Sequence, residues 1–305
     1  MSSLSTNSLT DVSVVPVRAW HLGSRYPHWF YLPAAVIFFV LFLLPTLASL
    51  YFSFTRWTLF DATFIGMGNF EQFFREPFLV QALANTMIFA ISTSALKTVI
   101  GLLLAMLLTS PILGQGYLRA VVFFPTLVST VGVGITFEVM MHPTQGVINQ
   151  TLATLGIAGP GWLVDPRLAL YSVILVEVWK GVGIATVIFM AGLISIPRDY
   201  YDAAMIDGAT GWQQFRSITL PLVWPATGSV IILSLLGGLR TFDLILTMTG
   251  GGPGFASDVL SSVVYKQYQA GFYGLSSAGN VVMTLMIAVI GIPLYAIIRS
   301  REVSN

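Results

Sequence analysis

The sequence predicts an all-α membrane protein with about six transmembrane helices. Apolar residues make up 55% of the 305-residue chain, charged residues make up only 9%, and the mean hydropathy is +0.82. A soluble domain carries about 25% charged residues, which keep its surface wetted. The apolar residues also gather into about six runs near the length that crosses a hydrocarbon core of ~30 Å. We therefore expect one membrane domain, residues 29–299, between tails at 1–28 and 300–305.

Polar, glycine-rich or proline-rich connections separate the predicted spans. The first 15 or so residues are rich in Ser and Thr and offer little to bury, so we expect a tail. The first apolar run is too long for a signal-peptide core, and we expect it to remain as a helix despite Pro33 and Pro45. The predicted spans cover about 29–54, 80–108, 118–141, 168–194, 225–248 and 278–298.

Charge and residue usage exclude several kinds of function. A net charge of +1 gives no reason to expect a nucleic-acid partner. The chain has no cysteine, which excludes disulfides and thiolate chemistry, and His21, His28 and His142 lack the spacing of metal ligands. We accordingly expect no catalytic residue, no metal site and no enzyme activity in this chain.

The distribution of Lys and Arg predicts the orientation in the membrane. With six spans, both termini and the loops after the second and fourth spans share one side. Because basic residues concentrate on the cytoplasmic side, the richer side is predicted to be cytoplasmic. That side carries seven basic residues (Arg18, Arg25, Arg119, Arg198, Arg216, Arg299 and Arg301) against four opposite (Arg56, Arg75, Arg167 and Lys266).

The polar loop after the fourth span predicts a short exposed helix. Pro197 suits a helix start, and Asp199 and Asp202 lie near the positive N-terminal end. Residues 203–204 are alanines, whose small side chains allow a partner surface to come close to that face of the helix. Gly208 suits the end of the helix, where a left-handed backbone or a close contact excludes a side chain.

A second amphipathic piece follows, with Trp212, Phe215 and Ile218 on roughly one side. We expect residues 220–221, Leu-Pro, to lead the chain back into the membrane, because proline bars simple continuation of the helix. A helix lying on the membrane surface is the alternative explanation of this pattern.

The loop from Tyr201 to Pro225 resembles the EAA loop of ABC importer permeases. That pattern reads E-A-A, two residues, D-G-A, and then F, I, L-P and a further P. Asp202 stands in place of the glutamate, which keeps the charge and shortens the reach by one methylene. The other positions match: Ala203, Ala204, Asp207, Gly208, Ala209, Phe215, Ile218, Leu220, Pro221 and Pro225.

Segments outside this loop resemble the carbohydrate branch of the family, over nearly the whole chain after the N-terminal tail. Within that branch, Phe242-Asp243 and the 249–254 run are similar to the larger maltose-permease subunit. The further matching segments are Phe52 to Thr55, Gly68 to Phe70, Arg119 to Pro125, His142-Pro143, Gly146, Asn149, Trp162-Leu163, Asp165-Pro166 and Glu177 to Lys180.

The resemblance implies a type I ABC importer permease fold with a cytoplasmic coupling helix, in a multi-pass protein of the cell (inner) membrane. It implies a second homologous permease, two ATPase subunits and an extracytoplasmic substrate-binding protein as partners, with ATP and Mg bound by the ATPases. The chain has no G-x-x-x-x-G-K-[ST] phosphate loop of its own. The implied ATPase-coupling residues, within the loop at 197–225, are Asp202, Ala203, Ala204, Asp207, Gly208, Ala209, Phe215 and Arg216.

Charged residues within or at the ends of the spans are a further signal, because such residues usually face the bundle interior or a cavity. They are Lys97, Glu138, Glu177, Lys180, Arg240 and Asp243. The spacing i,i+3 predicts that Glu177 pairs with Lys180 and Arg240 with Asp243, while Lys97 snorkels or pairs across helices. Structural pairs without a transport role are the alternative.

A narrow stripe of small and polar residues on the fifth span is a candidate sugar-contacting face. Ser234, Gly238 and Thr241 recur at i, i+4 and i+7, and the resemblance implies that this helix and the fourth contribute to the sugar site. The matching stripe on the fourth span contains Glu177, Gly181 and Ile184. Close packing of helices through small residues is the alternative.

The sequence thus predicts a permease subunit that imports a sugar or oligosaccharide by ATP-driven alternating access. Three alternatives remain open: an ABC permease for an amino acid or oxyanion, an integral-membrane enzyme, and a secondary transporter that works alone.

Overall fold

The computed structural model describes residues 28–57 and 60–302, so the predicted tail at 1–28 lies almost wholly outside the described residues. The chain divides into two compact units, residues 1–46 and 47–305. The described part of the first unit is helical: η1 (His28–Tyr31), α1 (Leu32–Phe38), a π turn η2 (Phe39–Leu43) and the start of α2 (Leu44–Phe52). In the π turn the amide of Leu44 donates to the carbonyl of Phe39. Pro45 follows and has no amide proton to continue the ladder.

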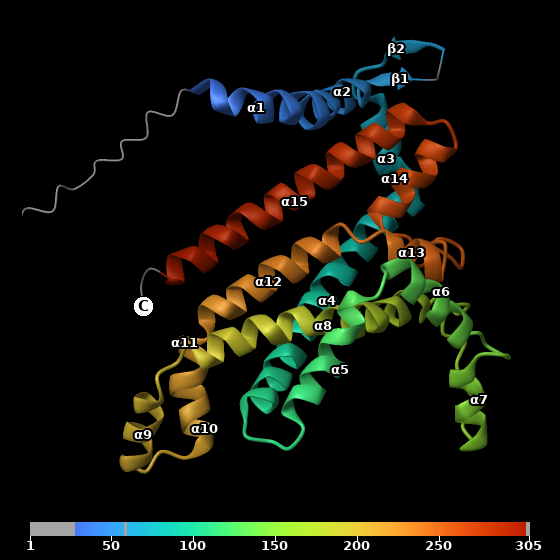
Figure 1. Cartoon of the computed structure of the whole chain (residues 1–305). Helices are drawn as coiled ribbons and strands as arrows, with labels where there is room; N and C mark the ends of the chain where they lie inside the picture. The colour runs from blue at the N-terminus through green and yellow to red at the C-terminus, as the bar shows by residue number, and fades with distance from the viewer. Residues whose placement is uncertain (1–27, 58–59, 303–305) are drawn as a thin grey trace, which may run out of the picture. The chain divides into compact units, whose positions relative to one another are not determined.

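The second unit is also almost entirely helical (Figure 1). After α2, a hairpin of two short antiparallel strands pairs Thr55 with Phe64. The remaining elements are β1 (Thr55–Trp57), β2 (Ala62–Phe64), α3 (Gly68–Arg75), α4 (Pro77–Thr109), α5 (Gln115–Leu127), α6 (Thr130–Met140), α7 (Val147–Thr154), α8 (Ala169–Ile194), α9 (Arg198–Ile206), α10 (Gly211–Gln214), the π turn η3 (Phe215–Thr219), α11 (Leu220–Leu222), α12 (Trp224–Leu239), α13 (Asp243–Met248), α14 (Leu260–Gln269) and α15 (Tyr273–Glu302).

Helix α4 forms the centre of this unit and packs against both α8 and α12. Its buried residues recur every three or four positions, for example Ala82, Phe89, Thr93 and Ala105, which is the repeat of one helix face. Small residues allow the backbones to approach closely, as membrane helices favour. A Cβ added to Gly238 of α12 would lie 2.7 Å from the Cα of Ala90.

The contacts of α4 also fix the directions of its neighbours. Along α4 and α8 the paired positions rise together: Lys97 faces Gly181, and Gly101 faces Ala185. The two helices are therefore parallel. Along α12 the numbers run the opposite way, because Ala90 faces Gly238 whereas Ser94 donates to the carbonyl of Ile231. This arrangement confirms that the second, fourth and fifth predicted spans alternate in direction as six crossings require.

Among the residues that the structure describes, four helices are long and apolar enough to cross a membrane, or up to six spans if each of two bent helix pairs counts as one. The four candidate spans that are not bent pairs are Trp29–Phe52, Pro77–Thr109, Ala169–Ile194 and Tyr273–Ser300. All-α architecture with about six spans is confirmed, and the predicted spans at 80–108 and 168–194 match α4 and α8 within about three residues.

Two predicted spans are not single helices. The third, predicted at 118–141, breaks between α5 and α6 with a bend of 97°. Val128 and Ser129 there adopt extended backbone, with ψ of 140° and 132°, three and four positions after Pro125 in the last turn of α5. The fifth, predicted at 225–248, ends at Leu239, and α13 follows as a separate short helix.

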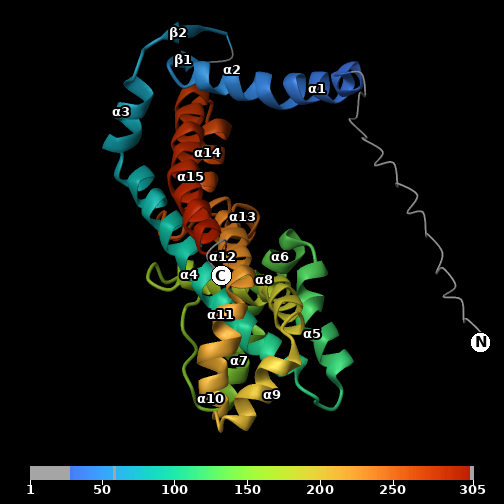
Figure 2. The ribbon, with the colours of Figure 1, turned by 90° about the vertical axis from the view of Figure 1, so that its left-hand side faces the viewer.

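The loops after α4 and after α8 lie at the same end of the unit. Figures 1 and 2 both show α9 and α10 near the turn between α4 and α5. A common buried cluster joins the C-terminal parts of α4 and α8 to the start of α12, through Ala105, Phe189, Ile196 and Val223. We call this end the coupling end, and the opposite end, which carries α3, α7 and α13 to α14, the far end.

Candidate functional site

The predicted short helix of the coupling loop is α9. Pro197 is its N-cap and Asp199 lies in its first turn, as expected. At its other end Gly208 is left-handed, with φ +77°. The amide of Ala209 donates to the carbonyl of Ala204 (2.9 Å), and that of Gly208 donates to Met205 (3.1 Å). These two bonds form a Schellman ending, which satisfies the last carbonyls of the helix.

The second half of the loop returns to the membrane through a continuous helical run. Thr210 caps α10 in a capping box with Gln213, and the run continues through η3 and α11. The predicted break at the Leu-Pro pair is wrong: Pro221 lies within the continuous helical run, directly after the π turn η3, in which the amide of Leu220 donates to the carbonyl of Phe215. A π turn shifts the hydrogen-bond ladder by one residue, so the helix continues past a residue that has no amide proton. The chain turns instead at Val223, where the helices are bent by 64°.

The tip of the loop is exposed, whereas its base is anchored. The hydroxyl groups of Tyr201 and Thr219 lie 2.9 Å apart and join α9 to η3. Of the predicted coupling residues, Asp202, Ala203, Asp207, Gly208 and Arg216 are exposed, and Ala204, Ala209 and Phe215 are half-buried. The motif did not identify two exposed apolar side chains on α9, Met205 and Ile206, of which Ile206 is 87% exposed.

A buried ion pair joins α4 to α8. The Lys97 ammonium lies 2.6 Å from Oε1 of Glu177, with side-chain exposures of 9% and 22%. The predicted Glu177–Lys180 pair is therefore wrong, and the alternative that Lys97 pairs across helices is confirmed. A like correction applies to Arg240 and Asp243: they end α12 and begin α13, and no ion pair joins them in the described residues. The helix ends between them, so the i,i+3 geometry does not exist.

Gly181 of the predicted path makes room for the Lys97 side chain. A Cβ at Gly181 would lie 2.5 Å from the Lys97 ammonium nitrogen and 2.6 Å from Cε.

The predicted stripe on the fifth span is only partly formed. Ser234 is half-buried on α12 and Gly238 is buried against α4, but Thr241 lies beyond the last residue of that helix. At Gly238 the structure thus agrees with the alternative that small residues allow helices to pack closely.

Asn149 organises the connection between α6 and α8 at the far end. Its amide donates to the carbonyls of Pro143 (2.9 Å) and Pro160 (3.1 Å), and its carbonyl accepts from the indole of Trp162 (2.7 Å). A Cβ at Gly159 would lie 2.3 Å from the Asn149 amide carbon. These contacts explain why the loop needs Asn149, Trp162 and the pair Gly159-Pro160 at these positions.

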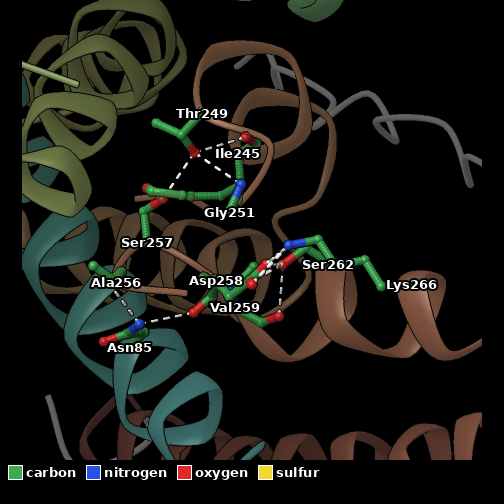
Figure 3. Close-up of polar contacts among 11 residues, drawn as sticks. Asn85, Ile245, Thr249, Gly251, Ala256, Ser257, Asp258, Val259, Ser262 and Lys266 are labelled. Carbon is green, nitrogen blue, oxygen red and sulfur yellow. Dashed lines mark hydrogen bonds and ion pairs between the residues drawn. The ribbon is translucent and has the colours of Figure 1, made fainter. Parts of the chain in front are cut away.

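A second polar cluster shapes the connection between α13 and α14 (Figure 3). The fully buried Asp258 carboxylate pairs with Lys266 (2.7 Å) and accepts from the Ser262 hydroxyl (2.7 Å). Asn85 of α4 donates to the backbone carbonyls of Ala256 (2.9 Å) and Asp258 (2.8 Å). The glycine run was visible in the sequence, but the pairing of Asp258 with Lys266 was not predicted.

The described residues contain no group of three or more His, Asp or Glu side chains that would hold a metal ion. The fold presents an exposed loop at one end, two hydrogen-bonded loops at the other, and a buried ion pair between the central helices. The exposed loop suits contact with a partner protein.

Comparison with known proteins assigns the family. The chain belongs to the binding-protein-dependent transport system inner membrane component family, whose pattern matches residues 87–301. The chain is thus a multi-pass inner-membrane transport component, which sets aside the membrane-enzyme alternative.

Two curated relatives and one solved structure are similar over most of their length. The trehalose/maltose transport system permease protein of Thermococcus litoralis is 33% identical over 84% of this chain and 88% of that protein. The lactose transport system permease protein of Rhizobium radiobacter is also 33% identical, over 90% of this chain and 94% of that protein. A chain in the crystal structure of a bacterial ABC transporter for alginate import shares the fold, with a TM-score of 0.78, 23% identity and coverage of 90% and 94%.

Proposed function

We propose that this chain is the permease subunit of an ATP-driven importer that moves a sugar or oligosaccharide into the cell by alternating access. The single observation that carries the proposal is the exposed α9 surface with its Gly208 ending, set in a chain of the permease family. The relatives named for trehalose, maltose and lactose transport support a saccharide as the substrate class.

The proposed assembly holds a second homologous permease, two ATPase subunits and an extracytoplasmic binding protein, in contact with membrane lipid. The sequence contains no phosphate loop, so ATP and Mg would bind to the ATPases and this chain would bind no cofactor. The exposed tip of α9 is the surface proposed to contact an ATPase. One solved relative in fold, the alginate transporter, is described in complex with a periplasmic protein that binds an alginate pentasaccharide.

The proposed orientation places both termini and α9 in the cytoplasm. The chain has no cysteine, so single-cysteine variants need no prior background mutation. We expect Met205→Cys on α9 to react with a membrane-impermeant maleimide only in inside-out vesicles. Thr154→Cys, on exposed α7 at the far end, is the matched variant and should react only from the opposite side. Labelling of Met205→Cys in right-side-out vesicles would refute the orientation.

The predicted substrate path stays a proposal for Glu177, Gly181, Ser234, Gly238 and Thr241. Glu177 is the strongest of these, because it combines a charge inside a span with a partly open side chain. A charged group within a membrane helix usually marks a transport path or an interior cavity.

Reconstitution tests the function as a whole. The complex of this chain with its partner permease, the ATPases and the binding protein is placed in liposomes. We expect ATP-dependent uptake of radiolabelled trehalose, maltose or lactose that stops when the ATPase subunits are omitted. Uptake that continues without them would indicate a secondary transporter. ATP-driven uptake of an amino acid or oxyanion, and of none of the sugars, would refute the proposed substrate class.

A further inference from the structure

The central helix of the bundle carries one charge in an unfavourable place. Helix α4, described along its whole length, has a single charged residue, Lys97. Lys97 belongs to the buried face of α4, between Thr93 and Gly101, and its side chain is 9% exposed. A buried ammonium within a membrane span needs a partner, and the described residues supply Glu177 at 2.6 Å.

The pair is built with an open side and a closed side. The Lys97 side chain passes against the backbone of α8 at Gly181, where a Cβ would collide with it. The ammonium group therefore reaches Glu177 from the side of α8 that faces α4. The Glu177 side chain is more exposed, at 22%, than that of Lys97. Oε1 of Glu177 accepts from Lys97, whereas Oε2 takes no hydrogen bond from the residues that the structure describes. The pair therefore presents a carboxylate oxygen outward, with the cation behind it.

The open side of Glu177 belongs to a face of α8 that no described helix covers completely. Glu177, Lys180, Ile184 and Ala191 follow one another at spacings of three, four and seven residues, so they share a face, and each is half-buried or exposed. Two charged groups on this face make contact with lipid tails costly. Protein or an aqueous path suits the face better than lipid does.

We infer that Lys97 is a positioning residue of the substrate path, which fixes the Glu177 carboxylate so that its free oxygen accepts hydroxyl groups of a neutral saccharide. The inference rests on the proposed function. A carboxylate held by an ammonium group is preorganised, and hydrogen bonds to a charged acceptor are stronger than neutral ones.

The test uses the complete reconstituted complex with its binding protein and radiolabelled trehalose and maltose as probes. In the double variant Lys97→Met/Glu177→Gln, methionine replaces the lysine stem and glutamine keeps the shape without charge, so no buried charge is left unpaired. In Gly181→Ala both charges stay, but the added Cβ displaces Lys97. Gly132→Ala is the matched control, since a Cβ there would lie 3.8 Å from the Cβ of Ser129, an ordinary contact.

The readouts are complex yield, ATP hydrolysis stimulated by the binding protein, and saccharide molecules moved per ATP. We expect the double variant to assemble and hydrolyse ATP within about twofold of wild type while moving at least tenfold less saccharide per ATP. Gly181→Ala should show the same loss, and the Gly132→Ala control should not. The KM for uptake should stay unchanged, since the binding protein captures the solute first.

The outcomes separate the inference from the function on which it rests. A double variant that assembles and transports like wild type would mean that the pair only holds α4 against α8, and it would overturn the inference alone. Wild-type complex that moves no saccharide would overturn the proposed function and the inference with it. A double variant that fails to assemble, combined with normal transport by Gly181→Ala, would also refute the positioning role.

Discussion

Replacing Gly208 should separate ATP hydrolysis from transport without preventing insertion. Gly208 has φ +77°, and a Cβ built there meets nothing within 4 Å. The cost within the chain is thus the left-handed backbone alone, roughly 1–2 kcal/mol for an ordinary L-residue. This is small against a domain stability of about 5–15 kcal/mol, but it lowers the population of the Schellman ending of α9 by a factor of about 5–30.

The variants assign the effect to its cause. Gly208→Val adds bulk and strain, whereas Gly208→Asn adds bulk in a residue that tolerates the left-handed region. Gly211→Ala is the control, because it adds a methyl group to the same exposed loop in open space without a positive φ. We expect saccharide moved per ATP to fall more than tenfold in the valine variant, to fall less in the asparagine variant, and to stay unchanged in the control.

The assay measures uptake and ATP hydrolysis in the same proteoliposomes, with the amount of inserted chain determined separately. Normal transport per ATP by Gly208→Val would refute the coupling role of the α9 ending. Loss of the inserted chain itself would contradict the estimate that the cost is confined to one backbone position.

The other two predictions concern packing. Asn149→Ala removes three hydrogen bonds at the far end, each worth about 1 kcal/mol. We therefore expect a lower melting temperature and altered Trp162 fluorescence. The control is Gln150→Ala at an exposed site, and an equal effect of that variant would contradict the prediction. Gly134→Ala brings a Cβ into collision with the Thr247 side chain of α13, so it should destabilise the complex. Thr247→Ala removes the hydroxyl but leaves a Cβ at 2.7 Å from the added one, so it should restore only part of the loss. Strictly additive melting temperatures would argue against that contact.

The coupling loop was largely readable from the sequence because its determinants are local. Pro197, Asp199 and Gly208 act within one or two turns of the positions they occupy, so the start and the end of α9 follow from backbone chemistry. The Leu-Pro pair was misread because proline usually interrupts a helix interior, whereas here a π turn precedes it and the helix continues. The residue pattern does not show that π turn.

Composition and hydropathy by themselves determined that the chain is a helical membrane protein with about six spans, since the thickness of a bilayer sets the length of an apolar run. The EAA-like motif by itself determined the family. Only the tertiary structure decided which charges meet. Glu177 has an opposite charge three residues away in Lys180, yet its partner is Lys97, 80 positions earlier, because Gly181 opens the route between two parallel helices. Spacing along a chain shows which pairs are possible, and the packing of helices selects among them.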